Sequence, residues 1–426
     1  MNHFELSGGE LACEDVGLSA IAEAVGTPVY VYSTATLERH YTVLRDALVS
    51  EGLGDPLIAF AVKSNSNVAV LRTLGRLGAG ADTVSEGEIR RALAAGIPAE
   101  RIVFSGVGKT EAEIAFALRN GVGEINVESE PEMHTASAVA QSMGTRATIA
   151  IRVNPDVSAG GHAKISTGKS DNKFGVSFSE AERLYAQASN NAGLKPVGVT
   201  CHIGSQITHL APLEEAFVKM RSLVERLRGE GLAVERLDLG GGLGVPYFNM
   251  PTPATPADYA AMIARTMKGL DVQFAFEPGR MISANAGVLL STVQHIHERP
   301  EGRKFVVLDA AMNDLIRPAM YDAYHDIRPV KPREGDPVTY DVVGPICETG
   351  DTFTRDRDLP RLEAGDLVAF MSAGAYGAVM SSEYNSRLLV PEVLVNGDQF
   401  AVIRPRPTYE DMLDREAMPG WLASDT

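Results

Sequence analysis

The sequence is poor in cysteine and in positive charge. Its three cysteines, Cys13, Cys201 and Cys347, are scattered and odd in number, which argues against a disulfide framework and indicates a reducing cytosol as the natural setting. Lysine and arginine number 39 against 55 acidic residues, and the formal net charge is -16. This balance argues against nucleic acid or an anionic membrane as a partner, because both select basic surfaces.

Long apolar runs are also missing. No stretch approaches the roughly 20 apolar residues of a transmembrane helix. The first residues, Met-Asn-His-Phe-Glu-Leu, lack the basic and apolar segments of a signal peptide. We therefore expect a cytoplasmic protein with no membrane partner. We also expect no bound metal.

The chain instead shows a regular alternation of short apolar segments with segments of helical spacing. Its 426 residues exceed the size of a usual single core, so two domains are expected. The apolar segments lie near 58–62, 81–84, 101–104, 124–127, 148–153, 197–201, 236–239 and 272–276. Eight strands alternating with helices predict a closed, TIM-like parallel β/α barrel, with a doubly wound open sheet as the alternative.

The residues that follow these segments favour the barrel. The strand ends carry Lys63; Asp82 and Ser85; Ser105; Asn126 and Glu128; Arg152 and Asn154; His202 and Ser205; Gly240, Gly241 and Gly242; Glu277 and Arg280. Barrels place their active sites at the carboxyl ends of their strands. An open sheet does not bring eight strand ends to one point.

After about residue 287 the pattern changes to strand-like runs without helices between them. The runs lie at 288–296, 305–308, 338–343, 367–371, 388–395 and 400–403. Asn396-Gly397 predicts a hairpin between the last two runs. We expect a barrel at 30–286 and an antiparallel β domain formed by 1–29 and 287–426.

Four other segments carry weaker signals. The stretches 329–337 and 354–363 are expected to be loops because they are rich in proline and charge. A short helix is expected near 409–415. The stretch 155–175 follows the fifth barrel strand and is a candidate lid over the active site.

Lys63 is the first candidate for chemistry. It ends the apolar run Ile58–Val62, and a partly desolvated lysine at the mouth of a barrel can act as a nucleophile. The alternative is a lysine that simply reaches from the strand end into water.

Two glycine-containing turns predict a phosphate site. Gly240, Gly241 and Gly242 follow one strand and Glu277-Pro278-Gly279-Arg280 the next. Consecutive glycines let backbone N–H groups converge on an anion, and barrels commonly hold phosphate after their seventh and eighth strands. Read alone, the glycines could equally form a flexible turn.

A phosphate site beside a strand-end lysine suggests pyridoxal 5'-phosphate, whose aldehyde bonds to lysine. Glu277 could then face the pyridine nitrogen and keep it protonated, which makes the ring an electron sink. Its alternative is a salt bridge to Arg280. His202 could stack on the ring or be a structural histidine beside Cys201.

Nine motifs occur in an order that carries a family resemblance. They are FAVKSN at 60–65, GADTVSEGE at 80–88, KFGV at 173–176, HIGSQI at 202–207, LDLGGGLGVPY at 237–247, EPGR at 277–280, NDLIRPAMYDAYH at 313–325, GPICETGD at 344–351 and GAYG at 374–377. Together they resemble the diaminopimelate decarboxylases, a pyridoxal-phosphate family with an alanine-racemase-like barrel and a C-terminal β domain. The resemblance implies decarboxylation of meso-2,6-diaminopimelate to L-lysine and carbon dioxide.

The resemblance also implies roles for individual residues. Lys63 would bond the cofactor and His202 would stack on its ring. The remaining cofactor contacts implied are Asp82, Ser205, Gly240, Gly241, Gly242, Glu277, Gly279, Arg280 and Tyr376. The substrate ligands implied are Arg280, Arg317, Tyr321, Glu348 and Tyr376.

Cys347 would be the proton donor, reaching the site from the partner subunit of a homodimer. Read in isolation, Arg317 and Tyr321 are a solvated helical pair, and Cys347 is a small buried residue. Two departures from the family pattern stand near the cofactor. Ser64 replaces a usual alanine, and Ser105-Gly106-Val107 replaces a common His-Gly-Asn.

Three other functions remain open on sequence grounds. A polyamine-pathway decarboxylase acting on ornithine, arginine or carboxynorspermidine would use the same chemistry, but its substrates lack the distal carboxylate that Arg280 and Arg317 suit. An amino-acid racemase would share the barrel but places arginine, not glutamate, at the ring nitrogen. A non-catalytic pyridoxal-phosphate carrier would need neither Cys347 nor Glu348.

Overall fold

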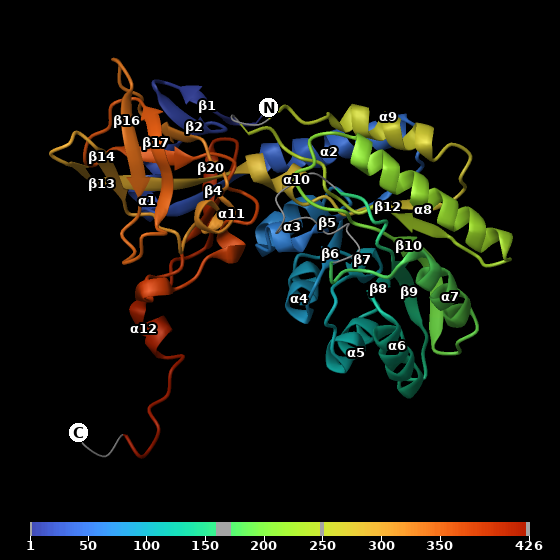
Figure 1. The fold of residues 1–426 in the computed structure, drawn as a ribbon. Coiled ribbons are helices and arrows are strands. Elements are labelled where there is room, and N and C mark those ends of the chain that lie inside the picture. Colours follow the sequence, from blue (N-terminus) through green and yellow to red (C-terminus); the bar gives the residue numbers. More distant parts are fainter. Residues whose placement is uncertain (1, 159–171, 248–250, 423–426) are drawn as a thin grey trace. The chain divides into compact units, whose positions relative to one another are not determined.

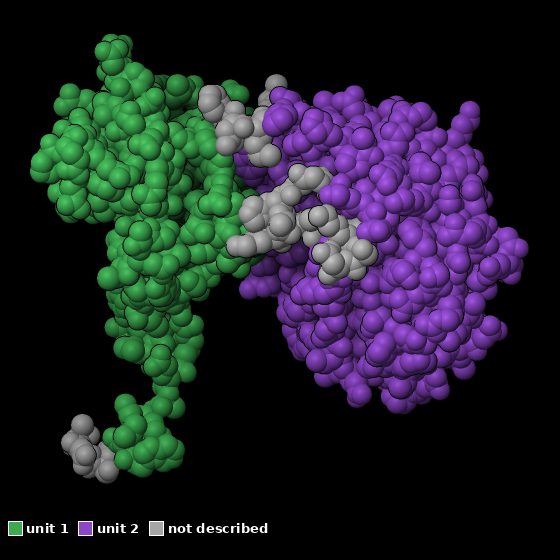
Figure 2. All heavy atoms as spheres, viewed as in Figure 1, with its two compact units in different colours: residues 1–33, 287–426 green, residues 34–286 purple. Residues whose placement is uncertain are grey.

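The computed structural model describes residues 2–158, 172–247 and 251–422. The chain forms two compact units, one made of 1–33 and 287–426 and the other of 34–286 (Figure 2). The expected boundary at residue 30 differs from this division by strand β4 (Val29–Ser33), which pairs with β13 and β19 of the first unit.

Unit 34–286 is a closed barrel of eight parallel strands, as predicted. Around the barrel the strand order is β10-β11-β12-β5-β6-β7-β8-β9. The strands are β5 (Leu57–Ala61), β6 (Gly80–Thr83), β7 (Ile102–Phe104), β8 (Glu124–Val127), β9 (Ala147–Arg152), β10 (Leu194–Thr200), β11 (Arg236–Asp238) and β12 (Gln273–Phe276). Because successive strands are parallel neighbours, all eight carboxyl ends lie at one end of the barrel.

Helices cover the outside of the barrel (Figure 1). They are α2 (Thr34–Ser50), α3 (Val68–Gly75), α4 (Glu86–Ala94), α5 (Glu111–Arg119), α6 (Glu130–Ser142), α7 (Phe178–Ser189), α8 (Ala211–Gly229), α9 (Pro256–Thr266) and α10 (Arg280–Ser283). Several begin at a capping side chain soon after a strand ends. Ser85 Oγ accepts from Glu88 N at the start of α4, and Ser129 Oγ does so from Glu132 N at α6. Ser85 therefore orders a helix start at the active-site face.

The other unit is built on a nine-stranded sheet with the main order β17-β16-β14-β13-β4-β19-β20. Its further strands are β13 (Gly287–Glu298), β14 (Lys304–Leu308), β15 (Ile327–Pro329), β16 (Val338–Val343), β17 (Thr352–Leu359), β18 (Leu367–Phe370), β19 (Glu392–Asn396) and β20 (Gln399–Arg404). The expected β domain is confirmed, and most of its pairs are antiparallel. The pairs β4–β19 and β14–β16 are parallel.

The N-terminal residues complete this unit. A small sheet of β1 (Phe4–Ser7), β2 (Glu10–Cys13) and β3 (Val16–Gly17) precedes α1 (Leu18–Val25). Leu18 and Ile21 of α1 pack in one apolar core with Val31, Leu290 and Val393 from three strands of the large sheet. Burying this helix face orders a segment whose own helix is short. The β1–β3 sheet was not predicted.

One loop prediction was wrong. Most of 354–363 belongs to β17, a strand at the edge of the sheet that pairs antiparallel with β16. Its side chains alternate partly, with Phe353 and Leu359 buried and the charged residues between them mostly exposed. Charged residues are common on edge strands because they oppose pairing with other chains. Composition alone could not separate this case from a loop.

Other local predictions were confirmed. A hairpin joins β19 and β20, with Gly397 and Asp398 as its two loop residues because Asn396 pairs with Gln399, and Gly397 has φ of 62°. The expected C-terminal helix is α12 (Tyr409–Leu413). No helix within the described ranges is long and apolar enough to span a membrane. Most of the candidate lid, 159–171, lies outside the described residues.

Candidate active site

Lys63 lies directly after β5, in the single turn η1 (Val62–Ser64). Its Nζ donates to Asp82 Oδ2 at 2.5 Å. The position follows from strand pairing, because Ala61 of β5 is opposite Asp82 of β6. The Asp82 side chain has no exposure, whereas the Lys63 side chain is 38% exposed. Lys63 is thus less desolvated than expected, and its ammonium is held by a buried carboxylate while the side chain stays accessible.

Three buried carboxyl groups, those of Asp82, Asp238 and Glu277, lie at the ends of the barrel strands β6, β11 and β12. Burial raises the pKa of Glu277 well above its usual range, and the nearby Asp238 and Asp82 raise it further. Burial also raises the pKa of Asp238 to about 7. Lys63 and Arg152 act in the opposite direction on Glu277. The site therefore favours an added positive charge near Glu277.

The side chain of Glu277 contacts the amide of Asn126, and not Arg280 as in the alternative interpretation. Asn126 Nδ2 at the end of β8 lies 3.4 Å from Glu277 Oε1 and 3.0 Å from Ser105 Oγ. Arg280 Nε instead donates to Ser205 Oγ at 3.1 Å, and Arg280 Nη1 lies 3.3 Å from Tyr247 Oη. Among the described contacts, Glu277 and Arg280 form no salt bridge.

His202 follows β10 and presents an uncharged ring. Its Nδ1 accepts from the N–H of Gly241 at 3.2 Å, so a neutral ring carries its proton on Nε2. Enclosure by the protein, together with the positive charges of Arg152 and Lys63, lowers the pKa of His202 to about 3. A ring that is neutral at physiological pH suits stacking on a cofactor better than proton transfer.

Positions 240 and 241 have to be glycine, because neighbouring backbone atoms leave no room for a side chain. A Cβ on Gly240 would lie 2.3 Å from Cys201 O, and one on Gly241 would lie 2.3 Å from Glu277 O. Gly240 N donates to Asp238 Oδ1 at 2.7 Å and Gly241 N to His202. These two N–H groups therefore have acceptors within the protein itself. Within the described contacts, the N–H of Gly242 is the remaining donor of the three.

Gly279 and Ser64 fit together beside Lys63. A Cβ on Gly279 would lie 3.1 Å from Ser64 Cβ. Ser64 Oγ donates to Ala61 O at 2.7 Å and receives a bond from Ser283 Oγ at 3.3 Å. The hydroxyl that replaces the usual methyl group is therefore satisfied within the protein. Ser105, the other departure, accepts from Asn126.

A buried lysine that the sequence did not single out supports these strand ends. Lys109 Nζ donates to Gly106 O and Asn126 O, each at 2.6 Å, and to Glu132 Oε1 at 2.7 Å. All three ammonium protons thus have acceptors. Burial lowers the pKa of Lys109, although Glu132 opposes this. The sequence signal was weak, because Lys109 stands in a polar loop.

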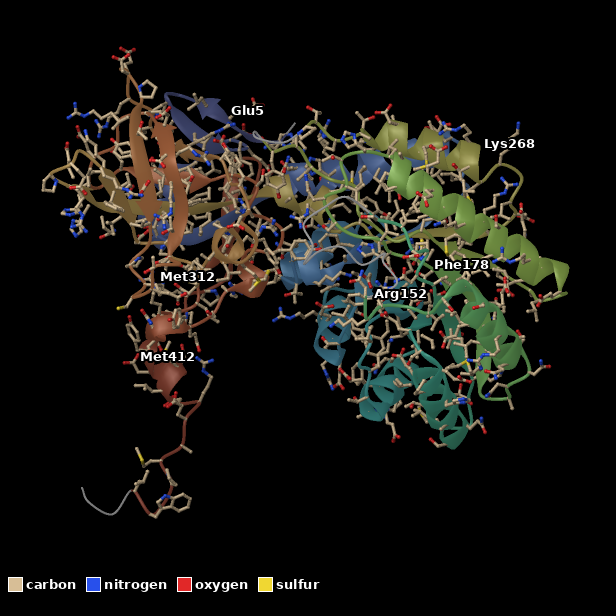
Figure 3. All side chains as sticks on the ribbon, viewed as in Figure 1. Glu5, Arg152, Phe178, Lys268, Met312 and Met412 are labelled. Carbon is tan, nitrogen blue, oxygen red and sulfur yellow. The ribbon has the colours of Figure 1, made fainter. Side chains whose placement is uncertain are left out.

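Glu128 connects the hydrogen bonds around Lys109 to Arg152, which lies at the end of β9 (Figure 3). Glu128 Oε1 accepts from Gly106 N at 2.9 Å and from Arg152 Nη1 at 3.0 Å. Glu128 N in turn donates to Glu132 Oε2 at 2.6 Å. The cation that lowers the pKa of both His202 and Glu277 is therefore fixed in place by a buried network.

The other expected residues lie in the β unit. Arg317 begins α11 (Arg317–Tyr321) and is buried, with its guanidinium carbon 5.8 Å from the Tyr321 ring and 5.9 Å from the Tyr376 ring. Tyr376 has φ of 56°, a strained value for a non-glycine residue. These three side chains lie close together, and Arg317 is not the solvated residue of the alternative interpretation.

Cys347 and Glu348 lie between β16 and β17. Cys347 is a free, exposed thiol, contrary to the alternative of a buried residue. Glu348 Oε2 accepts from Tyr384 Oη at 2.8 Å, and Cys347 N donates to Asn385 Oδ1 at 3.0 Å. Tyr384 and Asn385 were not identified from the sequence, because they follow the GAYG motif in a polar stretch without a pattern of its own.

A barrel with a strand-end lysine, a buried glutamate and a neutral histidine defines a class of cofactor-dependent enzymes. Residues 35–284 match the family model described as "Pyridoxal-dependent decarboxylase, pyridoxal binding domain". This range is more than half of the chain, so the protein is a pyridoxal-phosphate-dependent carboxy-lyase.

The relatives narrow the class. A diaminopimelate decarboxylase of Zymomonas mobilis is 50% identical over 422 residues, covering 98% of this chain and 99% of the relative. That of Pseudomonas aeruginosa is 49% identical over 419 residues, with the same coverage. The crystal structure of the M. jannaschii diaminopimelate decarboxylase with L-lysine has a TM-score of 0.94 and 37% identity, covering 99% of this chain and 100% of that one. The chain belongs to the diaminopimelate decarboxylase family.

A more distant relative shares the fold with other substrates. The lysine/ornithine decarboxylase of Vibrio vulnificus, crystallised with putrescine, has a TM-score of 0.78 and 25% identity, and the match covers 89% of this chain and 97% of that one. The higher identity to diaminopimelate decarboxylases disfavours the polyamine-pathway alternative.

Proposed function

We propose that the barrel strand ends hold pyridoxal 5'-phosphate in this enzyme, which decarboxylates meso-2,6-diaminopimelate to L-lysine and carbon dioxide, the last step of lysine biosynthesis. The observation that carries the assignment of the site is the buried Glu277 beside the Lys63–Asp82 ion pair. A buried carboxyl with a raised pKa is stabilised as a carboxylate when a protonated pyridine nitrogen comes next to it.

The residues present fit this cofactor. Asp82 Oδ1 and Asn126 Oδ1 are buried polar atoms without hydrogen-bond partners, which is costly unless a ligand or solvent completes them. Lys63 would bond the aldehyde carbon, His202 would stack on the ring, and Glu277 would face the nitrogen. Ser205, Gly242, Gly279 and Arg280 would lie near the phosphate, with Gly240 and Gly241 allowing the close approach of the loops.

Pyridoxal phosphate, when bound, supplies the electron sink for the pair left by the departing carboxylate. The chain's own residues do the rest. Lys63 would hold the aldehyde carbon of the cofactor between turnovers, and the substrate amine would take its place there while a substrate is bound. Cys347 or Lys63 delivers a proton to the α carbon. His202 stays neutral and does not take part in proton transfer.

Recognition of the distal end of the substrate decides specificity. Diaminopimelate carries both a carboxylate and an ammonium there. Arg317, with Arg280, suits the carboxylate, because a guanidinium binds it through two parallel hydrogen bonds. Glu348 suits the ammonium, and Tyr321 and Tyr376 border Arg317. Firm anchoring at this end holds the breaking bond in the orientation that the ring requires.

The enzyme is proposed to act as a cytoplasmic homodimer with shared active sites. Cys347 and Glu348 are exposed in the single chain, which is compatible with contributing them to a partner's site. The free state of all three cysteines is compatible with a reducing compartment.

The direct test of the proposed function is a substrate comparison. Release of lysine and carbon dioxide from meso-diaminopimelate should exceed turnover of ornithine or arginine. Turnover of ornithine or arginine at an equal or higher kcat/KM would contradict the assignment. Mixing Lys63→Ala and Cys347→Ala subunits should restore part of the activity if the sites are shared, and no restoration would overturn that part of the proposal.

A further inference from the structure

A short loop of the β unit touches both residues proposed to act from the partner subunit. The loop contains η6 (Tyr384–Ser386) and follows the GAYG motif. Tyr384 Oη donates to Glu348 Oε2 at 2.8 Å. The next residue, Asn385, accepts at Oδ1 from Cys347 N at 3.0 Å. Two consecutive side chains thus hold two consecutive residues of the facing loop.

The backbone of this loop adopts a costly conformation. Asn385 has φ of 56° and ψ of 27°, and Ser386 has φ of 55°. Left-handed conformations at two adjacent non-glycine residues persist only where the surroundings determine them. Tyr384, Asn385 and Ser386 are exposed in the single chain, so burial of their own side chains does not supply this restraint. The conformation must be held by the contacts of the loop with its neighbours.

Asn313 supplies the anchor at both ends of the loop. Its backbone oxygen accepts from Ser382 N at 2.9 Å, and its Nδ2 donates to Ser382 O at 3.1 Å. Its Oδ1 accepts from Arg387 Nε at 3.2 Å. Asn313 is buried and lies four residues before Arg317. The loop is therefore tied to the segment that leads to the proposed carboxylate-binding arginine.

Asp351 closes the connection on the other side. Its Oδ1 accepts from the N–H of Met312, and its Oδ2 from the N–H of Ile346, each at 2.7 Å. Met312, labelled in Figure 3, directly precedes Asn313. The loops that carry Cys347 with Glu348 and Tyr384 with Asn385 contact each other through exposed hydrogen bonds. Each of them is also tied to the segment before Arg317 by a buried side chain, Asp351 or Asn313.

We propose that Tyr384 and Asn385 are positioning residues, which fix the Cys347–Glu348 turn relative to the loop that carries Arg317. The inference rests on the roles proposed above for Cys347 and Glu348. Tyr384 occupies one oxygen of the Glu348 carboxylate and holds the other for the substrate ammonium. Asn385 accepts the Cys347 N–H and so sets the direction of the thiol. Tyr384 acts on substrate binding and Asn385 acts on proton delivery.

The two residues are separated by their kinetic effects. In the cofactor-loaded enzyme, Tyr384→Phe should raise KM for meso-diaminopimelate by about tenfold, the loss expected for a hydrogen bond to a charged group, with kcat within about twofold of the original value. Glu348→Gln should raise KM as well. In the Glu348→Gln background, Tyr384→Phe should have little further effect, because the hydrogen bond acts through the Glu348 carboxylate.

This double-mutant cycle distinguishes the possible failures. An unchanged KM in Tyr384→Phe, or an equal rise in both backgrounds, overturns the role of Tyr384 and leaves the proposed function intact. An unchanged KM in Glu348→Gln overturns the ammonium-binding role of Glu348 and the role of Tyr384 with it. Tyr409→Phe is the matched control, because Tyr409 is also exposed, at 59%, and lies on α12. It should leave both constants unchanged.

Asn385 needs a pair of variants, because its backbone conformation disfavours most side chains. Asn385→Gly keeps the left-handed conformation and removes the acceptor, while Asn385→Asp keeps both. We expect kcat to fall by about tenfold in the glycine variant, a loss equivalent to one hydrogen bond, and to recover in the aspartate variant with KM little changed. Equal kcat in the two variants would overturn the role of Asn385. If Asn385→Gly does not fold, the Tyr384 cycle decides the proposal.

Discussion

Lys63 Nζ donates to Asp82 Oδ2 at 2.5 Å, across two neighbouring strands of the barrel. Because Asp82 has no exposure and Lys63 keeps 38% of its side-chain exposure, the ion pair fixes the lysine without sealing it off. The amine can therefore be both oriented by the protein and reached by a cofactor and a substrate.

Lys63→Ala should abolish activity and the visible absorbance of the lysine-bound cofactor. No other residue of the site can replace the amine, so we expect turnover to fall by several orders of magnitude, on the scale of losing a covalent catalyst. Spectra and lysine release measured on the same preparation check this. Lys268→Ala is the control, because Lys268 is exposed on the outside of the barrel unit (Figure 3). A coloured, active Lys63→Ala enzyme would refute the assignment.

Glu277→Gln should lower kcat by roughly a hundredfold, equivalent to about 3 kcal/mol, while the cofactor still binds. A neutral amide cannot keep the ring nitrogen protonated, so the electron sink is weaker. Steady-state kinetics with the absorbance of the bound cofactor measure the two effects separately. A kcat close to that of the original enzyme would show that Glu277 does not face the ring nitrogen.

Although Glu277→Gln should lower kcat, it should raise the stability of the cofactor-free enzyme. Folding raises the pKa of Glu277. Above about pH 4.5 the unfolded state therefore binds fewer protons at this carboxyl group than the folded state does. For this reason the free energy of unfolding falls as the pH rises from there. Glu277→Gln removes this loss, so the variant should be more stable than the original at pH 8 and about equally stable near pH 4. Urea unfolding across this range tests the sign.

His202 should remain neutral across the working range of the enzyme. With a folded-state pKa of about 3, its NMR signal should not titrate between pH 5 and 8. Its depressed pKa also stabilises the fold above an unfolded pKa of about 6.5, and this contribution is lost as the pH falls towards 3. His202→Asn should therefore show a weaker acid-dependent loss of stability. A titration of His202 near pH 6.5 would contradict the neutral, stacking role.

Arg317→Ala should raise KM for meso-diaminopimelate by about a hundredfold, as expected when a bidentate guanidinium–carboxylate contact is removed, with the cofactor still bound. Turnover at saturating substrate should change less than KM. Arg361→Ala is the control, because the Arg361 side chain is 70% exposed. An unchanged KM would argue against recognition of the distal carboxylate by Arg317.

Lys109→Met should destabilise the enzyme by about 3–5 kcal/mol, the usual cost of breaking a buried ion pair on one side. The variant leaves Glu132 buried without its cation and removes the donor to Gly106 O and Asn126 O. Lys268→Met, at an exposed position, should have little effect. Urea unfolding of both variants gives the comparison, and similar free energies of unfolding would show that the Lys109 network is not structural.

The sequence alone determined the architecture and the residues at the strand ends. The eight apolar runs each became a strand, because a run of that length between helical segments is stable only when it is buried on both faces. Successive strands of a β/α barrel are parallel, so their carboxyl ends lie together at one end of the barrel. The sequence could therefore place four residues that follow or end these strands at that end: Lys63, Asp82, His202 and Glu277.

The tertiary structure decided which groups at those ends are charged, paired or neutral. The pKa of His202 depends on Arg152 and Lys63, and that of Glu277 on Asp238 and Asp82, yet these residues are far apart in the sequence. The support from Lys109 and the contacts of Tyr384 and Asn385 likewise join distant segments. Local patterns report burial and periodicity, whereas hydrogen bonds and charge–charge interactions depend on distances that only the folded chain defines.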